Sequence, residues 1–247
     1  MESNLDIANV CILAGKIMLE SGAETHRVED TMNRIAAVYG AENAQSYASP
    51  TAIHFSVDFA DVTHFIRISN RSTDLHKVAE VNHISRRIAS ESIPLKESMI
   101  LLETLEKRRL TFSKWIQVVA ATLLSGCFAI MFGGMMPDFL PAAIVGGAGF
   151  ACMLIVFHFI RIRFVAVFFA SVLVGALAVT AIETGVGLEL DKIVIGAVMP
   201  LVPGLPITIA LRDLLAGHLV AGISKGIESA LTAVAIGAGV AIILAFY

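Results

Sequence analysis

The chain has 247 residues, 56% of them hydrophobic, and 18 Lys and Arg against 21 Asp and Glu give a formal net charge of −3. Residues 1–114 carry 13 of the 18 basic and 15 of the 21 acidic side chains, so a polar front part precedes a strongly apolar rear part. This split argues against a soluble globular enzyme, and the slightly negative charge argues against a nucleic-acid-binding protein.

The front part, residues 1–114, is expected to fold as a cytoplasmic α+β domain that precedes the membrane helices. Apolar residues recur with helical spacing in four segments and alternate in two others, which predicts helices and strands respectively. The expected elements are a helix that Gly22 ends, a helix over 25–39, strands over 51–58 and 62–68, and helices over about 73–91 and 94–109, with Pro94 in the first turn of the last.

The corner between the first two helices reads Gly22-Ala23-Glu24-Thr25-His26-Arg27-Val28-Glu29 and is rich in charge. On a structural interpretation, Gly22 ends one helix and Thr25 caps the next. On a functional interpretation, Glu24, Thr25, Arg27 and Glu29 belong to a site. The residues alone favour the structural interpretation and leave the functional one open.

His54 and His64 lie on the two expected strands, and we expect them to meet across the hairpin near Asp58 and Asp61. Such a group is compatible with a metal or hydrolytic site, so an enzymatic front domain is an alternative. The sequence contains no HExxH or CxxC motif, and its three cysteines lie far apart. We therefore expect surface histidines, no metal and no cofactor.

Five segments of the rear part, residues 115–247, are long and apolar enough to cross a bilayer, which takes about 20 residues. They cover about 115–134, 139–159, 164–183, 193–211 and 227–246. We expect the chain to lie in the cell (inner) membrane. Basic residues concentrate near alternate span ends, which predicts a cytoplasmic N-terminus and an external C-terminus. These residues are Lys107, Arg108, Arg109 and Lys114, then Arg161 and Arg163, then Arg212 and Lys225.

The fourth span contains Pro200, Pro203, Gly204 and Pro206 within seven residues. An internal proline removes a helical hydrogen bond and costs about 3 kcal/mol or more, so a regular helix is not expected here. Irregular backbone at membrane depth is tolerated where it is buried in protein or lines a wet cavity, and broken helices build solute sites in many transporters. A proline-kinked structural helix is the alternative.

Polar side chains follow this break. Thr208 and Arg212 are four residues apart and share a helix face if the helix resumes after Pro206. A buried Arg212 needs a partner, for which Asp213 or a bound carboxylate is a candidate; otherwise Arg212 marks the cytoplasmic end of the span beside a solvated Asp213. His218 is a candidate proton carrier or the cap of an interfacial helix.

Small residues occur at 146–149 and, as a GxxxG pair, at Gly222 and Gly226. They permit close helix packing within the chain, in a homo-oligomer or against a second membrane subunit.

The corner Gly22 to Glu29, followed by a polar α+β domain and five spans, resembles the threonine/serine exporter family. The rear stretch Leu201-Val202-Pro203-Gly204, continuing to Arg212-Asp213, Gly217-His218, Gly222 and Glu228, resembles that family as well. With five spans, the chain is similar to the larger subunit of the split two-component form. That form works with a small second membrane protein, and succinate export is the activity associated with it.

The resemblance implies efflux of small carboxylate-bearing metabolites, threonine and serine or a dicarboxylate such as succinate, by a transporter and not an enzyme. Family members usually carry Asn where Ile209 stands, a departure that concerns the substrate more than the fold. The alternatives are a membrane-anchored hydrolase and a regulatory scaffold subunit. The resemblance carries site roles over to Glu24, Arg27 and Glu29 in the corner and to Pro203, Gly204 and Asp213 in the rear.

Overall fold

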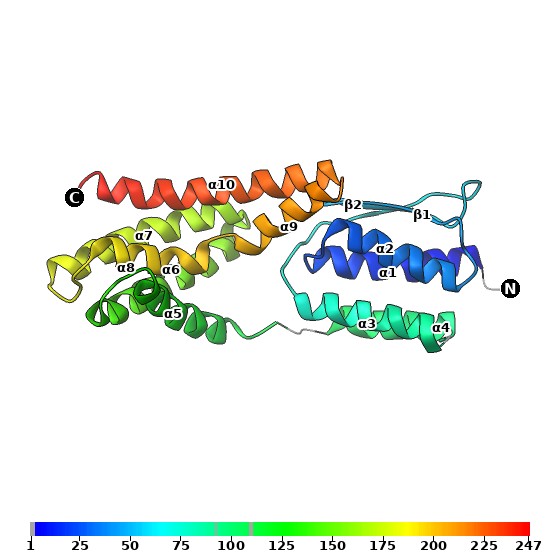
Figure 1. The fold of residues 1–247 in the computed structure, drawn as a ribbon, viewed down its shortest axis with the longest axis horizontal. Coiled ribbons are helices and arrows are strands. Elements are labelled where there is room, and N and C mark those ends of the chain that lie inside the picture. Colours follow the sequence, from blue (N-terminus) through cyan, green and yellow to red (C-terminus); the bar gives the residue numbers. More distant parts are fainter. Residues whose placement is uncertain (1–2, 92, 109–110) are drawn as a thin grey trace. The chain divides into compact units, whose positions relative to one another are not determined.

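The computed structural model describes residues 3–91, 93–108 and 111–247 (Figure 1). The chain forms two compact units. The first comprises Met1–Thr111 and Thr208–Gly226, and the second comprises Phe112–Ile207 and Ile227–Tyr247. The first unit therefore joins the polar front part to a short stretch that a long apolar segment separates from it in the sequence.

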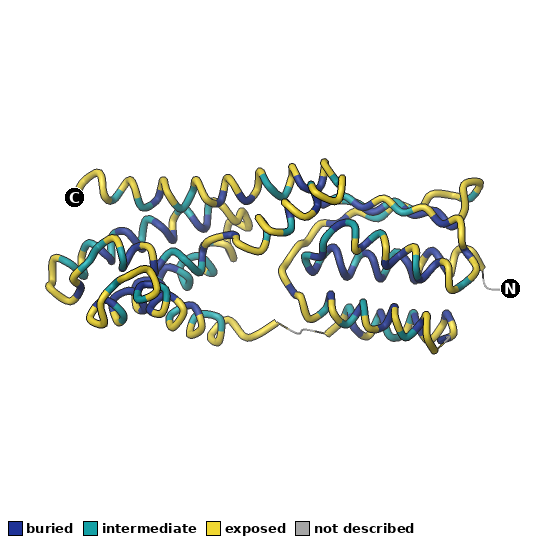
Figure 2. The backbone as a smooth tube through the Cα atoms, in the orientation of Figure 1, coloured by how far each residue is buried: buried dark blue, intermediate teal, exposed yellow. Residues whose placement is uncertain are grey.

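The front part of the first unit packs helices around α1 and beside a three-stranded antiparallel sheet. α1 contacts α2, α3, α4 and β2, and Figure 2 shows buried residues along α1 and α2. The buried positions Ile7, Val10, Ala14 and Ile17 follow the helical spacing seen in the sequence. The elements are α1 (Asn4–Glu20), α2 (Thr25–Val38), β1 (Gln45–Ser49), β2 (Ala52–Ser56), β3 (His64–Arg67), α3 (Leu75–Glu91) and α4 (Leu95–Lys107), with strand order β1-β2-β3.

Most elements of the front part match the prediction with small shifts, and one strand is new. The sequence does not predict β1, because only Ala48 in this mostly polar strand is buried. Pro94 lies one residue before α4 and not in its first turn. The last helix ends at Lys107, and its expected end at Arg109 lies outside the described residues.

The expected meeting of His54 and His64 is wrong. β2 and β3 pair so that His54 lies opposite Phe65 and His64 lies opposite Phe55. Because successive side chains on a strand point to opposite faces, this register puts the two histidines on opposite faces of the sheet. Ring contacts join His54 to Phe65 and Tyr47 instead, with centroid distances of 5.0 and 6.1 Å.

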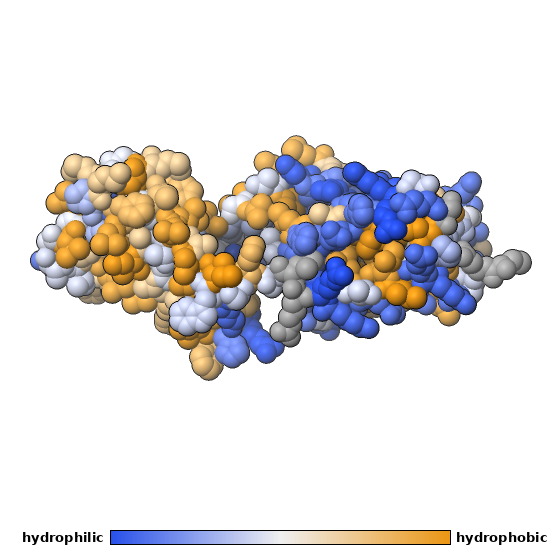
Figure 3. Space-filling model, turned by 90° about the horizontal axis from the view of Figure 1, so that it is seen from below, coloured by the Kyte–Doolittle hydropathy of each residue, from blue (hydrophilic) through white to orange (hydrophobic). Residues whose placement is uncertain are grey.

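The rear part consists of long apolar helices, and Figure 3 shows hydrophobic residues over most of the visible face of the second unit. Among the described residues, four helices are long and apolar enough to cross a membrane, or five if one bent pair counts as a span. The bent pair, Leu190–Leu201 with Gly204–Leu215, turns by 59° at its break. The elements are α5 (Lys114–Met131), α6 (Met136–Ile160), α7 (Arg163–Glu183), α8 (Leu190–Val198), the 3-10 helix η1 (Met199–Leu201), α9 (Gly204–Leu215) and α10 (Leu219–Leu244).

The first three predicted spans correspond to α5, α6 and α7, and the last two need correction. The predicted span 193–211 is the bent pair, and its second helix continues to Leu215. α10 begins at Leu219 and not at 227, so the predicted polar segment between the last two spans is helical except at residues 216–218.

Glycines let α6 approach its neighbours closely, as the small-residue pattern predicts. A Cβ added at Gly146 would lie 2.0 Å from the Oγ of Ser125, and one at Gly147 would lie 2.1 Å from the Oγ1 of Thr122. The GxxxG pair divides: a Cβ on Gly222 would lie 2.6 Å from Leu214, whereas one on Gly226 would meet no described atom within 4 Å.

Candidate functional site

The proline-rich stretch after α8 is a break between helices, as the sequence predicts. Pro200 lies in η1, Pro203 is buried between η1 and α9, and Gly204 and Pro206 lie in the first turn of α9. The N–H of Gly204 donates to the carbonyl two residues earlier at 2.9 Å, and the prolines have no amide hydrogen. Few amides at this helix start are therefore available to a carboxylate, so the break contributes more to the bend of the chain than to anion binding.

The corner motif meets the α9–α10 turn inside the first unit. We call the resulting group of side chains the charged cluster. It consists of Glu24, Thr25, His26 and Glu29 from the corner, and Arg212, Asp213, His218 and Lys225 from α9, the turn and α10.

Gly22 ends α1 with a φ of +82°, a conformation that favours glycine, and this places the corner. The N–H of Ala23 donates to the carbonyl of Met18 at 3.0 Å, which closes the helix end as expected for a glycine cap. α2 begins at Thr25 with Glu24 at the N-cap position, so the prediction that Thr25 caps the helix is wrong. The side chain of Glu24 does not cap α2 either.

The carboxylate of Asp213 on α9 takes the capping role. Its Oδ1 accepts the backbone N–H of Thr25 at 2.8 Å, and its Oδ2 accepts the hydroxyl of Thr25 at 3.0 Å. Both residues are 0% exposed, so the interpretation of Asp213 as solvated is wrong. A buried carboxylate needs hydrogen bonds and positive potential in place of water, and the N-terminus of α2 supplies part of each.

Lys225 on α10 supplies the opposite charge. Its Nζ lies 2.7 Å from Oδ2 of Asp213, and it also donates to the hydroxyl of Thr25 at 3.3 Å and to the carbonyl of Ala23 at 3.4 Å. The lysine side chain is only 12% exposed. The sequence gives no reason to pair Lys225 with Asp213, because their 12-residue separation is too long for neighbours on one helix face.

Arg212 pairs with Glu24 of the corner, and not with Asp213 as considered from the sequence. Its Nη1 donates to Oε1 of Glu24, and the two side chains are 60% and 12% exposed respectively. Asp213 is not available to Arg212, because its oxygens already bind Thr25 and Lys225. The cluster therefore keeps one guanidinium accessible to solvent beside a buried ion pair.

Two histidines complete the cluster. Nδ1 of His218 lies 3.8 Å from Oε1 of Glu29, which also accepts the N–H of Ala48 at 2.8 Å. Nε2 of His26 lies 3.6 Å from Oε2 of Glu24, and the two imidazole rings are 6.5 Å apart between centroids. The buried Nδ1 of His26 makes no hydrogen bond to a described residue. Because histidine gains and loses its proton near neutral pH, both rings are candidate proton carriers, and sequence reasoning names only His218.

The other predicted residues lie beside the cluster. Arg27 is exposed on α2 and forms no ion pair with a described residue. Thr208 is exposed on α9 one turn before Arg212, as their four-residue spacing predicts, and Ile209 is half-buried next to it.

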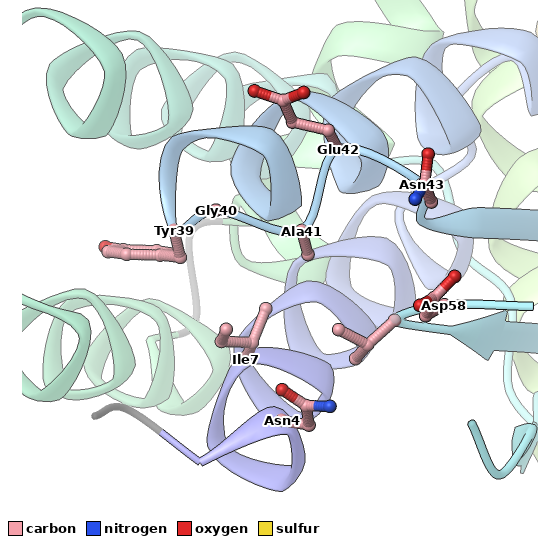
Figure 4. Close-up of a pocket in the computed structure, with 9 residues that line it drawn as sticks. Asn4, Ile7, Tyr39, Gly40, Ala41, Glu42, Asn43 and Asp58 are labelled. Atoms are coloured by element: carbon pink, nitrogen blue, oxygen red, sulfur yellow. The ribbon is translucent and has the colours of Figure 1, made fainter. Parts of the chain in front are cut away.

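A pocket of about 360 Å³ lies elsewhere in the first unit, between the start of α1 and the end of α2 (Figure 4). Its lining includes Asn4, Tyr39, Glu42 and Asp58, and it shares no residue with the charged cluster. The charged cluster, with two cations, three carboxylates and two histidines, is therefore the candidate functional site.

Known proteins resemble the chain over most of its length. The family model of putative threonine/serine exporters matches residues 9–247. A protein of Klebsiella aerogenes named "Probable succinate transporter subunit YjjP" is 24% identical, over 92% of this chain and 88% of its own. The Escherichia coli K12 protein of the same name is 23% identical, over 100% and 96%.

A third relative is longer. The "Probable threonine/serine exporter" of Mycobacterium tuberculosis H37Rv is 24% identical over 57% of this chain, which is 27% of that protein. No solved structure matches the chain.

Proposed function

The chain belongs to the family of putative threonine/serine exporters, and from this premise we propose that it is a subunit of a secondary transporter that exports small carboxylate-bearing metabolites. The family and its named relatives are transporters, not enzymes, and several apolar helices make the chain a multi-pass membrane protein. No observation favours a hydrolytic front domain, since His54 and His64 face opposite sides of their sheet.

The charged cluster is the observation that carries this proposal. From segments 188 residues apart, it brings together Glu24, Glu29 and Asp213, three of the six residues that the family resemblance singles out. Arg212 is exposed enough to attract a solute carboxylate, and Thr208 one turn earlier offers a hydroxyl on the same helix. Asp213, His218 and His26 are the groups for coupling a proton, and the break at Pro200 to Pro206 is the hinge of alternating access.

Two classes of solute fit this arrangement. Threonine and serine carry one carboxylate and one ammonium group, whereas succinate carries two carboxylates. The names of the relatives point both ways, and Ile209 places an apolar side chain on α9. A dicarboxylate would use a second cation, for which the cluster contains Lys225, provided that Asp213 releases it.

The relatives named as subunits support a partner, and we propose a small second membrane protein in the same bilayer. The positions of the basic residues support a cytoplasmic N-terminus and an external C-terminus. The charged cluster then lies on the side of the front domain, where it receives solute from the cytoplasm.

Efflux from preloaded cells tests the proposal. Cells expressing this chain, with and without the small subunit, are loaded with labelled threonine, serine or succinate, and the loss of label is followed. Efflux should require both chains and fall sharply with Pro203→Ala and Arg212→Gln. The matched control is Arg86→Gln, because Arg86 is exposed on α3 and forms no ion pair with a described residue. If no solute moves although the two chains co-purify, the proposed function is wrong.

A further inference from the structure

We infer that Lys225 is a positioning residue of the transport site: it holds Asp213 away from Arg212, so that the guanidinium of Arg212 stays accessible to a solute carboxylate. The inference rests on the proposed function for its consequence in transport, and on geometry alone for the positioning itself.

The geometry begins with two neighbours of opposite charge on α9. Arg212 is 60% exposed and turns to Glu24, whereas Asp213 is 0% exposed and turns to Thr25 and Lys225. Adjacent residues on a helix point in directions about 100° apart, so each finds partners on a different side of α9. The cluster thereby keeps the Arg212–Glu24 and Asp213–Lys225 ion pairs separate, although Arg212 and Asp213 are adjacent in the sequence.

The separation depends on Lys225. Asp213 is buried against the first turn of α2, whose dipole and amide compensate only part of a full negative charge. The lysine ammonium at 2.7 Å supplies the rest. If it is removed, the buried carboxylate is under-compensated, and Arg212 is the cation of the cluster that remains to it.

The expected consequence is an exchange of partners. Without Lys225, the guanidinium of Arg212 leaves Glu24 and solvent and turns to Asp213. It then becomes less accessible to reagents and to solute. Replacing Asp213 by asparagine in the same chain removes the competing charge, so Arg212 should return to its exposed position even though Lys225 is still absent.

This rescue distinguishes positioning from a purely structural role. If Lys225 only braced α10 against the corner, removing a second member of the network would add to the damage. If it acts through Asp213, the neutral double variant Lys225→Met/Asp213→Asn repairs the access to Arg212. Lys225→Arg keeps the charge, so the access to Arg212 is expected to match that of the unmodified protein.

The first readout is chemical modification of the purified full chain with phenylglyoxal, which reacts with accessible guanidinium groups, measured by mass spectrometry at Arg212. Arg86, exposed on α3, is the internal reference. The ratio of modification at Arg212 to that at Arg86 should fall in Lys225→Met and recover in the double variant. An unchanged ratio in Lys225→Met, or no recovery in the double variant, overturns the inference.

The second readout is the KM of carboxylate efflux. Lys225→Met should raise KM by about fivefold, the factor that corresponds to ~1 kcal/mol for loss of an exposed charge interaction. The double variant is assessed by the modification ratio alone, because Asp213 and Lys225 both belong to the proposed transport site. The maximal rate is not the readout, because Asp213 is itself a candidate coupling residue. If the unmodified protein exports no carboxylate, the proposed function fails, while the modification pattern still decides the positioning.

A third variant covers the case in which Lys225→Met does not fold. Lys225→His carries a charge at pH 5.5 and loses most of it by pH 8.5, so the counter-charge can be removed from an already folded chain. The Arg212-to-Arg86 ratio should fall more steeply with pH in this variant than in the unmodified protein. The other ionisable neighbours, Glu24, Glu29, His26 and His218, are the same in both proteins. Parallel pH curves overturn the inference.

Discussion

Replacing Thr25 by valine changes the size of the side chain little, yet it should destabilise the chain more than the same replacement of a surface threonine does. The hydroxyl of Thr25 donates to the carboxylate of Asp213 at 3.0 Å and lies 3.3 Å from the ammonium of Lys225. Valine keeps the backbone N–H that donates to Asp213 but cannot form either side-chain contact. Because Thr25 and Asp213 are both 0% exposed, water cannot take the place of the hydroxyl.

The magnitude follows from the charge of the acceptor. A hydrogen bond to a charged group contributes about 1.5–3 kcal/mol to stability, and its loss in a buried site is not repaid by solvent. At about 2–4 °C per kcal/mol for chains of this size, the melting temperature should fall by roughly 3–12 °C.

Thermal unfolding of the purified chain, followed by the fluorescence of Trp115 or by light scattering, measures this fall. The matched control is Thr104→Val, because Thr104 is exposed on α4 and its hydroxyl donates to the carbonyl of Ile100 in the same helix, at 2.7 Å. A double-mutant cycle with Asp213→Asn isolates the interaction. If Thr25→Val lowers the melting temperature no more than the control does, or if the cycle shows a coupling below ~0.5 kcal/mol, the proposed geometry of the buried carboxylate is refuted.

Three further outcomes follow from packing and charge. Gly146→Ala should lower the stability of the fold by about 1–3 kcal/mol, because the new Cβ would lie 2.0 Å from the Oγ of Ser125 on α5. Gly237→Ala is the control and should be neutral or stabilising, because no described atom lies within 4 Å of its Cβ. Equal shifts in melting temperature for the two variants would contradict this packing. Burial raises the pKa of the Cys11 thiol to about 12, so iodoacetamide should label it at pH 8 only after unfolding, and rapid labelling of the folded chain argues against the burial. The hydrogen bond that Lys16 donates to Glu106 raises the pKa of the lysine. Below pH 10.5, Lys16→Met should therefore lower the free energy of unfolding by less than ~1 kcal/mol relative to the unmodified protein. This difference should disappear as the pH rises through the raised pKa of Lys16 in the folded chain.

The local pattern of the sequence was sufficient for most helices. Residue spacing predicts the apolar face of α1 and the spans that correspond to α5, α6 and α7, because helical periodicity depends only on residues close together in the chain. No apolar pattern predicts the strand β1, because four of its five residues are at least partly exposed. The pairing of His54 with Phe65 depends on strand register, and a shift of one residue reverses which side chains share a face.

The candidate site was predicted in parts and not as a whole. The corner and the α9 residues were each identified from charge and spacing, yet their contact joins positions 188 residues apart. No periodicity links such positions, so the partners of Asp213 and Arg212 could be named only as alternatives. Lys225 was missed for the same reason: it lies beyond a helix break from Asp213, where spacing within one helix no longer applies.

The cluster also gives a physical reason for the corner motif in the front domain. Arg212 and Lys225 are two of only five basic residues in the rear part, and each has a carboxylate partner in the cluster. A buried lysine at the start of an apolar helix is stable only with such a partner, and the Asp213 that serves it is itself stabilised by Thr25. Each charge in the group therefore depends on a residue from another segment. A change in one ion pair therefore affects the others, as coupling between the proposed solute site and the proposed proton carriers would require.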